Sequence, residues 1–216
     1  MKSRSPKKLV IGLTGAILSG KSTALAFFKQ AGAAVLSADS IVAQLYQKPS
    51  VRARLERTLG TADKNLLARA VFRDAQKRRQ LEAVIHPLVL RGLRREIKAC
   101  TAPVIVCEIP LLFEAGWEKE VDLTVAVCAD EKTLPARLAS RGLSRAQYRQ
   151  RLKNQLPEAE KCRRADSVIY HASQTDLGLK VKRLYQAFDL LCNRSNNGRQ
   201  NDAGKKCKTC QRNQNA

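Results

Sequence analysis

Residues 15–23 read GAILSGKST and match G-x-x-x-x-G-K-[ST], the pattern of a phosphate-binding loop, or P-loop. Gly15 and Gly20 let the backbone bend so that successive N–H groups point inward at phosphate oxygens. Lys21 can reach the β- and γ-phosphates, and the hydroxyl of Ser22 can bind Mg²⁺. The stretch therefore predicts a binding site for a nucleoside triphosphate.

The segments on either side of this loop support the motif. Residues 9–14, LVIGLT, form an apolar run that is typical of a buried strand. Residues 24–32, ALAFFKQAG, place apolar side chains at helical spacing and end at Gly32, a common helix stop. Strand, loop and helix is the arrangement that a P-loop requires, because the positive end of the helix faces the phosphates. A glycine turn that arose by chance would leave both flanks unexplained.

Five apolar runs are predicted to be buried strands, and helical patterns separate most of them. This alternation predicts an α/β fold with a parallel sheet and helices on both faces. Ligands of such sheets bind at the carboxyl ends of the strands. The P-loop, Asp39 and Glu108 would all lie at that edge. The predicted strands are 9–14, 33–36, 104–109, 123–128 and 167–170.

Two stretches interrupt the alternation. Residues 48–97 carry helical patterns with no strand-like run, which predicts an inserted helical subdomain. Residues 142–164 are rich in Arg and Lys and have few large apolar side chains, so we expect them to bury little and to be mobile. A mobile, arginine-rich segment beside a nucleotide site is typical of a lid. An exposed helical hairpin without a role is the alternative.

The remaining boundaries follow from these two insertions. A chain of 216 residues suits one compact domain. Its nucleotide-binding core is predicted at 9–47, 98–141 and 165–192, after a basic extension at residues 1–8. Residues 193–216 carry six basic residues, one acid and no large apolar side chain, so they are predicted to be disordered.

The formal net charge of +21 at pH 7 is unusually basic. Such a field favours anionic ligands and, non-specifically, nucleic acid. Aromatic residues make up only 5% of the chain, too few for a basic and aromatic surface that stacks bases. We therefore expect small anionic substrates and no specific nucleic acid. A P-loop protein that binds nucleic acid is the alternative.

The sequence predicts a cytoplasmic protein without membrane contact. No window approaches the roughly 18 to 20 apolar residues of a membrane span. The basic start followed by an apolar run looks like a signal peptide, but cleavage would remove the P-loop strand. Seven cysteines without a secretion signal argue against a disulfide framework. Cys107 and Cys128 are expected as small buried apolar residues, and the pair Cys207 and Cys210 is too small for a closed zinc site.

Several side chains at the ligand edge are candidates for phosphoryl transfer. Asp39 could accept a proton from an attacking hydroxyl, with a helix N-cap as the alternative. Glu108 ends a strand on which many P-loop proteins carry an acid that helps to hold Mg²⁺. His86 is equally compatible with packing and with a role in the site. Arginines around the lid could neutralise the transferred phosphoryl group; they are Arg137, Arg141, Arg145, Arg149 and Arg151.

Further segments accompany the P-loop in a fixed order: LSADSIVAQLY, LARAVF, LEAVIHPLV, EIPLLFEAG, RLASRGLSRAQYRQRLKNQ and ADSVIYHAS. Together they resemble the dephospho-CoA kinase family, whose members transfer a phosphoryl group from ATP to the ribose 3′-hydroxyl of dephospho-coenzyme A. The similarity runs from about residue 9 to residue 191. The P-loop alone is not specific, but its combination with ADS, IHP and PLLFE is.

The resemblance implies a three-layer P-loop kinase fold with a helical substrate-binding insertion and a lid. It implies ATP and dephospho-CoA as substrates and Mg²⁺ as the metal, for which Ser22 and Glu108 are the candidate ligands. Asp39 would be the base, and Lys21 and Arg141 would assist it. The residues implied for ATP are Gly15, Leu18, Ser19, Gly20, Lys21, Ser22 and Thr23. Those implied for the substrate are Asp39, His86, Leu111, Arg141 and Arg151.

The chain departs from the family pattern in three places. Leu18 replaces a glycine, which would cost about 1 kcal/mol if its φ is positive. Glu108 stands where the family usually has Asp, and residues 170–173 match a segment that usually contains Asn.

The sequence therefore predicts a kinase that completes coenzyme A from dephospho-CoA. A kinase of the same fold acting on another small hydroxyl compound is the nearest alternative. A GTP-operated switch is a third, although the chain contains no N-K-x-D sequence for guanine recognition. The oligomeric state is not indicated.

Overall fold

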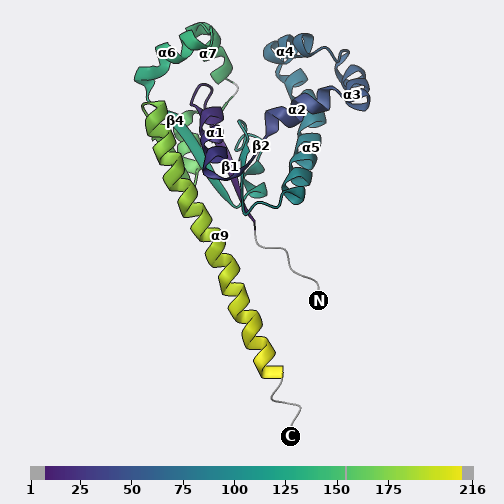
Figure 1. The fold of residues 1–216 in the computed structure, drawn as a ribbon. Helices are drawn as coiled ribbons and strands as arrows, with labels where there is room; N and C mark the ends of the chain where they lie inside the picture. Colours follow the sequence, from purple (N-terminus) through teal and green to yellow (C-terminus); the bar gives the residue numbers. More distant parts are fainter. Residues whose placement is uncertain (1–7, 154, 211–216) are drawn as a thin grey trace.

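A five-stranded parallel sheet forms the centre of the computed structural model, which describes residues 8–153 and 155–210 (Figure 1). The strand order is β2-β3-β1-β4-β5, and every neighbouring pair is parallel. The strands are β1 (Leu9–Gly15), β2 (Ala34–Ser37), β3 (Val104–Glu108), β4 (Leu123–Ala129) and β5 (Ser167–His171). All five match the predicted strands to within one residue at each end, so the predicted α/β fold is confirmed.

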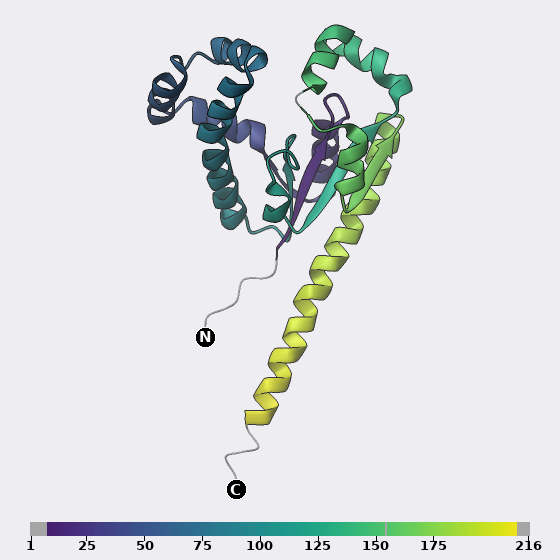
Figure 2. The ribbon, with the colours of Figure 1, turned by 180° about the vertical axis from the view of Figure 1, so that it is seen from behind.

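Helices cover both faces of this sheet and complete the three layers (Figure 2). They are α1 (Lys21–Ala31), α2 (Ala38–Tyr46), α3 (Pro49–Leu59), α4 (Lys64–Arg73), α5 (Ala75–Ala99), α6 (Leu134–Ser140), α7 (Arg145–Leu152), α8 (Glu158–Arg164) and α9 (Gln174–Cys210). On one face, Phe28 of α1 and Val181 of α9 pack against β1 through Ile11. On the other, Ile41 of α2 and Val89 of α5 belong to a second apolar cluster. The strands are buried on both sides, which explains their near-continuous apolar sequence.

Two groups of helices extend beyond the sheet at the end where the P-loop lies (Figures 1 and 2). Helices α3 and α4, with the adjoining part of α5, form one of them, and α6 with α7 forms the other. Asp63 and Asp74 accept hydrogen bonds from backbone N–H groups and so cap α4 and α5. Helix α5 contains His86 and Pro87 in its interior and continues beyond them to Ala99.

The segment 142–164, predicted to be a mobile lid that buries little, divides into two different parts. Helix α7 has no buried residue. Helix α8, in contrast, packs against β4 and β1, and the side chain of Lys161 is completely buried. The expectation of little burial is therefore wrong for α8, because a lysine can be buried when an acidic partner and a carbonyl satisfy its charge.

The C-terminal region also differs from its prediction. Disorder was expected from residue 193, but helix α9 continues to Cys210, and residues 211–216 lie outside the described residues. Figure 1 shows α9 running well past the sheet. Elongating an existing helix is far easier than nucleating one, so the packed first part of α9 can extend into a sequence that would not begin a helix. Residues 1–7 of the predicted extension lie outside the described residues as well.

Both cysteines that were predicted to be buried are buried, but only one of them is a free thiol. Cys107 is a buried free thiol, and burial raises its pKa to about 12. Cys128 on β4 is instead joined in a disulfide to Cys162 on α8. Their Cα atoms are 7.7 Å apart, wider than is usual for a disulfide.

Candidate active site

The P-loop joins β1 to α1 and has two unusual backbone positions. Gly20 adopts a φ of 91°, and a Cβ placed there would lie 2.9 Å from Nε2 of His171. Leu18 adopts a φ of 63°, the left-handed conformation that its sequence left open. Arg137 of α6 donates one hydrogen bond to the Leu18 carbonyl and another, of 2.8 Å, to the Asp130 carbonyl. Arg137 therefore supports the strained residue of the loop.

Lys21 is buried, with 8% of its surface exposed. Its Nζ donates a 2.7 Å hydrogen bond to the Ala16 carbonyl at the start of the loop. Burial lowers the pKa of Lys21 to about 8, although the negative charges of Glu108 and Asp39 raise it in part. A phosphate in the loop would restore the charge-stabilising environment that burial removes.

Ser22 and Glu108 lie together, as the metal-binding prediction requires. The Ser22 hydroxyl donates a 2.9 Å hydrogen bond to Oε1 of Glu108, which is buried at the end of β3. A hydroxyl and a carboxylate are oxygen donors of the kind that Mg²⁺ binds, with phosphates and waters completing its coordination. Among the described residues there is no group of three or more His, Cys, Asp or Glu side chains that could hold a metal alone. The pair thus suits an ion that arrives with a nucleotide.

A cavity of about 490 Å³, here called the loop cavity, lies against the P-loop. Gly15 and Ser19 do not line it. Gly15 is packed against the Val127 carbonyl, and the Ser19 side chain is buried. The predicted site residues that line it are Leu18, Gly20, Lys21, Ser22, Thr23, Asp39, Glu108, Arg141 and Arg151.

A second cavity of about 350 Å³, the insertion cavity, lies between α2, α5 and the loop after β3. His86 and Leu111 line it, together with Asp39 and Arg151. The His86 ring is half-buried and meets Trp117 edge to face, with centroids 5.2 Å apart. Burial lowers the pKa of His86, so the ring is neutral near pH 7. His86 thus packs against Trp117 and also lines the insertion cavity.

Asp39 lines both cavities and is exposed in the first turn of α2. The alternative that it caps this helix is wrong, since the N-cap is Ser37 and no side-chain cap bond forms there. Its carboxylate is therefore not engaged in capping and faces the space where the two cavities meet. Arg141 at the end of α6 and Arg151 on α7 are also exposed beside this space.

Sequence reasoning missed a set of polar contacts that holds the loop from behind. Nε2 of His171, a buried residue at the end of β5, lies 2.8 Å from the Ser19 carbonyl and must donate to it, since a carbonyl oxygen only accepts. His171 occupies the segment where the family usually has Asn. Together with the contact of Arg137 on Leu18, this bond fixes two consecutive loop carbonyls. Only the departure from the expected Asn marked this position in the sequence.

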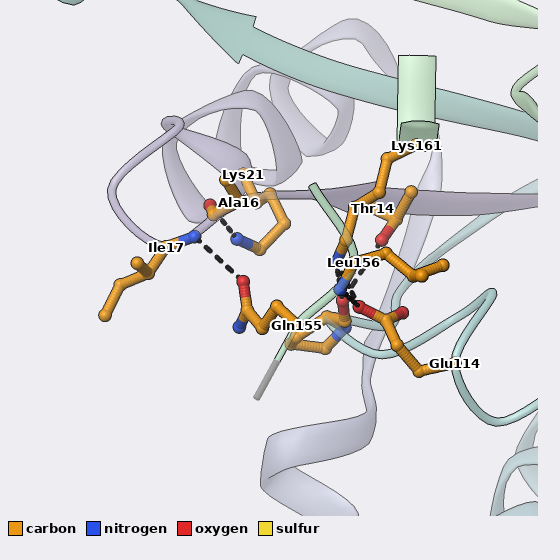
Figure 3. Close-up of polar contacts among 9 residues, drawn as sticks. Thr14, Ala16, Ile17, Lys21, Glu114, Gln155, Leu156 and Lys161 are labelled. Carbon is orange, nitrogen blue, oxygen red and sulfur yellow. Dashed lines mark hydrogen bonds and ion pairs between the residues drawn. The ribbon is translucent and has the colours of Figure 1, made fainter. Parts of the chain in front are cut away.

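Glu114 and Lys161 form a second missed cluster at the same edge (Figure 3). Lys161 Nζ lies 2.9 Å from Glu114 Oε1 and donates a 2.8 Å hydrogen bond to the Pro110 carbonyl. Glu114 Oε1 also accepts from the backbone N–H of Leu156, at 2.8 Å. Gln155, the residue before, extends to the P-loop, where its Oε1 accepts from the Ile17 N–H at 3.2 Å. The segment between α7 and α8 is thereby tied to the sheet edge.

The arrangement matches known proteins along most of its length. A family model described as Dephospho-CoA kinase matches residues 9–176. A dephospho-CoA kinase from Symbiobacterium thermophilum is 39% identical over 180 residues, which cover 77% of this chain and 75% of that protein. A crystal structure from Thermus thermophilus has a TM-score of 0.76 and 36% identity, covering 84% of this chain and 97% of that one.

A dephospho-CoA kinase structure from Campylobacter jejuni shares the fold, with a TM-score of 0.60 and 22% identity over 82% of this chain and 95% of its own. Both the extent of the family match and the identity to the Symbiobacterium protein are high enough to assign the family. The chain belongs to the dephospho-CoA kinase family.

Proposed function

We propose that the chain phosphorylates the ribose 3′-hydroxyl of dephospho-CoA with ATP, which gives coenzyme A and ADP and completes coenzyme A synthesis. The observation that carries this proposal is the meeting of two cavities at Asp39, one beside the P-loop and one beside the helical insertion. A kinase for two substrates needs such a junction, because the donor phosphorus and the acceptor oxygen must approach to about 3 to 3.5 Å.

The loop cavity would hold the ATP phosphates. The backbone N–H groups of the loop and the N-terminus of α1 point positive charge at this space. Lys21 would leave the Ala16 carbonyl for the β- and γ-phosphates, which favour its charged form. Of the loop residues, Gly15 and Ser19 would support the bend, and Leu18, Gly20, Ser22 and Thr23 face the cavity.

The insertion cavity would hold dephospho-CoA. Apolar side chains such as Val89 and Leu111 line its interior, and the half-buried ring of His86 provides a flat surface that is packed against the buried Trp117. A neutral His86 can accept or donate a hydrogen bond without attracting a competing anion. Arg151 at the mouth supplies the positive charge that a diphosphate-containing substrate requires.

In the chemical step, the 3′-oxygen of the substrate forms a bond to the γ-phosphorus as the bond from this phosphorus to the β-bridging oxygen breaks. The 3′-hydroxyl proton passes to the Asp39 carboxylate, and ADP leaves. Negative charge spreads over the three equatorial oxygens in transit. Lys21 and Arg141 would stabilise this charge and Arg151 would assist, once the exposed α7 region closes over the site and excludes water.

Ser22 and Glu108 would hold Mg²⁺ with the phosphates. The ion supplies charge neutralisation at the β- and γ-phosphate oxygens when it is bound. Glu108 would orient the Ser22 hydroxyl, which already donates to its carboxylate.

We further propose a cytoplasmic enzyme that uses small molecules, with no specific nucleic-acid partner. No helix in the described part of the chain is long and apolar enough to cross a bilayer. A kinase of the same fold with another acceptor remains the competing function, and the specific lining of the insertion cavity favours dephospho-CoA over it.

The test is to mix purified protein with MgATP and dephospho-CoA and to detect coenzyme A by mass spectrometry. Lys21→Ala is the matched control, since it removes the phosphate-binding charge but leaves the insertion cavity intact. Product from the wild type and none from the control is the expected result. ATP binding without product, together with turnover of another hydroxyl compound from a panel of nucleosides and sugars, would overturn the proposed acceptor.

A further inference from the structure

The side chain of Gln155 lies at the junction of the two cavities. In the part of the chain that the structure describes, the residues lining both the loop cavity and the insertion cavity are Asp39, Pro110, Arg151 and Gln155. A phosphoryl group that moves from ATP to an acceptor must pass this junction. Gln155 belongs to the segment between α7 and α8, and its side chain is partly buried.

The orientation of the Gln155 amide follows from its partner. The backbone N–H of Ile17 can only donate, so the atom 3.2 Å away is the side-chain oxygen, Oε1. The nitrogen, Nε2, then carries two N–H donors and makes no hydrogen bond to any described residue. Figure 3 shows this side chain extending to the loop beside Lys21.

The backbone at Gln155 is held both by α7 and by the sheet edge, and its own N–H donates a 2.9 Å hydrogen bond to the carbonyl of Leu152 at the end of α7. The next residue, Leu156, donates its N–H to Glu114, and Glu114 is paired with the buried Lys161. Lys161 also binds the Pro110 carbonyl, which accepts a further 3.2 Å hydrogen bond from Thr14 of β1. Gln155 is therefore tied to the sheet edge by contacts that lie outside α7.

We propose that Gln155 is a further catalytic residue of the phosphoryl transfer, whose Nε2 donates hydrogen bonds to the phosphoryl group in transit while its Oε1 remains on Ile17. Glu114 and Lys161 are positioning residues for it. A fixed amide suits this place, because it stabilises developing negative charge without reorganising during the reaction. The inference rests on the proposed function, since it concerns the phosphoryl group that this function moves.

Two substitutions separate the role of the Nε2 donor from that of the hydrogen bond that Oε1 accepts from Ile17. Gln155→Glu retains an acceptor for the Ile17 N–H but has no N–H donor. Gln155→Met has nearly the same length, is neutral and has neither group. We expect both variants to lose about 10²-fold in kcat, the scale of one lost donor to a reacting oxyanion. The KM for ATP of the neutral variant should stay within about threefold of the wild type, because the donor acts on the transferring group.

A binding measurement gives a readout that does not depend on turnover. ADP with aluminium fluoride and the acceptor imitates the transferring phosphoryl group and should bind far more tightly than ADP alone. Calorimetry should show that Gln155→Met keeps the wild-type affinity for MgADP and loses at least tenfold in affinity for the fluoride complex. Gln147→Glu, the same exchange at the capping residue of exposed α7, is the control and should leave both affinities and kcat unchanged.

Wild-type kcat for Gln155→Glu would mean that only the hydrogen bond to Ile17 matters, and it would overturn the inference. Wild-type affinity of Gln155→Met for the fluoride complex would overturn it as well. Thermal unfolding of each variant, monitored by circular dichroism, shows that a lost affinity is not a lost fold. All comparisons use the acceptor that the wild type turns over, so a failure of dephospho-CoA as acceptor counts against the proposed function alone.

Discussion

Helices α7 and α8 are neighbours in one basic segment, yet the structure uses their cations in opposite ways. Arg151 of α7 is exposed at the junction of the two cavities. Lys161 of α8 is completely buried and is bound to Glu114 and to the Pro110 carbonyl. The difference teaches that charge density along a sequence does not reveal which cations serve ligands. Lys161, whose charge is satisfied by two partners inside the protein, stabilises the fold, whereas the exposed Arg151 is available to a substrate.

The same contrast separates the acidic side chains of the site. Glu108 is buried and accepts from Ser22, whereas Asp39 is exposed and is not used to cap its helix. We therefore expect substitution of Asp39 to impair chemistry while leaving the fold intact, and substitution of Glu108 to disturb the Ser22 hydroxyl that it would orient.

The largest effect is expected for Asp39→Ala. Loss of a general base should lower kcat by about 10² to 10⁴-fold, because no other carboxylate of the described residues lines both cavities. ATP affinity, measured by calorimetry, and the midpoint of thermal unfolding should stay close to the wild type. Near-normal turnover of Asp39→Ala would contradict the role of Asp39 as the general base.

Lys161→Met should instead act on stability. Removing one partner of a buried ion pair leaves Glu114 without its cation and costs about 3 to 5 kcal/mol of unfolding free energy. Urea denaturation measures this loss. Arg163→Met is the control on the same helix, since the ion pair between Arg163 and Glu160 lies at the protein surface. This variant should unfold at the same urea concentration as the wild type. Equal midpoints for the two variants would show that the buried pair does not anchor α8.

The pH dependence should reveal the third cation, Lys21. Its pKa is lowered to about 8 by burial, so the free enzyme loses this charge as the pH rises through 8. The value of kcat/KM for ATP should be constant just below this pH and should then fall, approaching tenfold per pH unit. Bound phosphates raise the pKa of Lys21, so kcat/KM for dephospho-CoA at saturating ATP should remain level to higher pH. A level profile for ATP up to pH 9.5 would contradict the placement of Lys21.

The smallest effect is expected from truncation after residue 193. The last buried side chain described in α9 is that of Cys192, and the helix beyond it extends away from the sheet (Figure 1). The shortened protein should keep wild-type kcat and KM in a steady-state assay. A large loss of turnover would show that the basic end of α9 is needed for activity.

Much of this molecule could be predicted because its signals are local. The apolar runs of the five strands and the P-loop pattern depend on neighbouring residues, and they gave the sheet and the loop cavity. The side chains at the carboxyl ends of strands, such as Asp39 and Glu108, followed from the topology of a parallel sheet. The glycine that Leu18 replaces raised the question of a positive φ there but did not answer it.

The missed features depend on contacts between distant segments. Lys161 can be buried because it pairs with Glu114. Glu114 is distant from it in the sequence, so no periodicity within α8 indicates this pairing. His171 and Arg137 reach the P-loop from other elements, and the Gln155 amide reaches it across 138 positions of the chain. Helix α9 exceeded its prediction because composition describes whether a segment can pack, and a helix already begun can continue without packing.

The most direct test of the central claim is a crystal structure of the protein with Mg²⁺, a non-hydrolysable ATP analogue and dephospho-CoA. The account predicts the γ-phosphate in the loop cavity, the substrate in the insertion cavity, and the 3′-oxygen within hydrogen-bond distance of the Asp39 carboxylate. That oxygen should lie in line with the γ-phosphorus at about 3 to 3.5 Å. A 3′-hydroxyl directed away from Asp39, or dephospho-CoA bound outside the insertion cavity, would contradict the account.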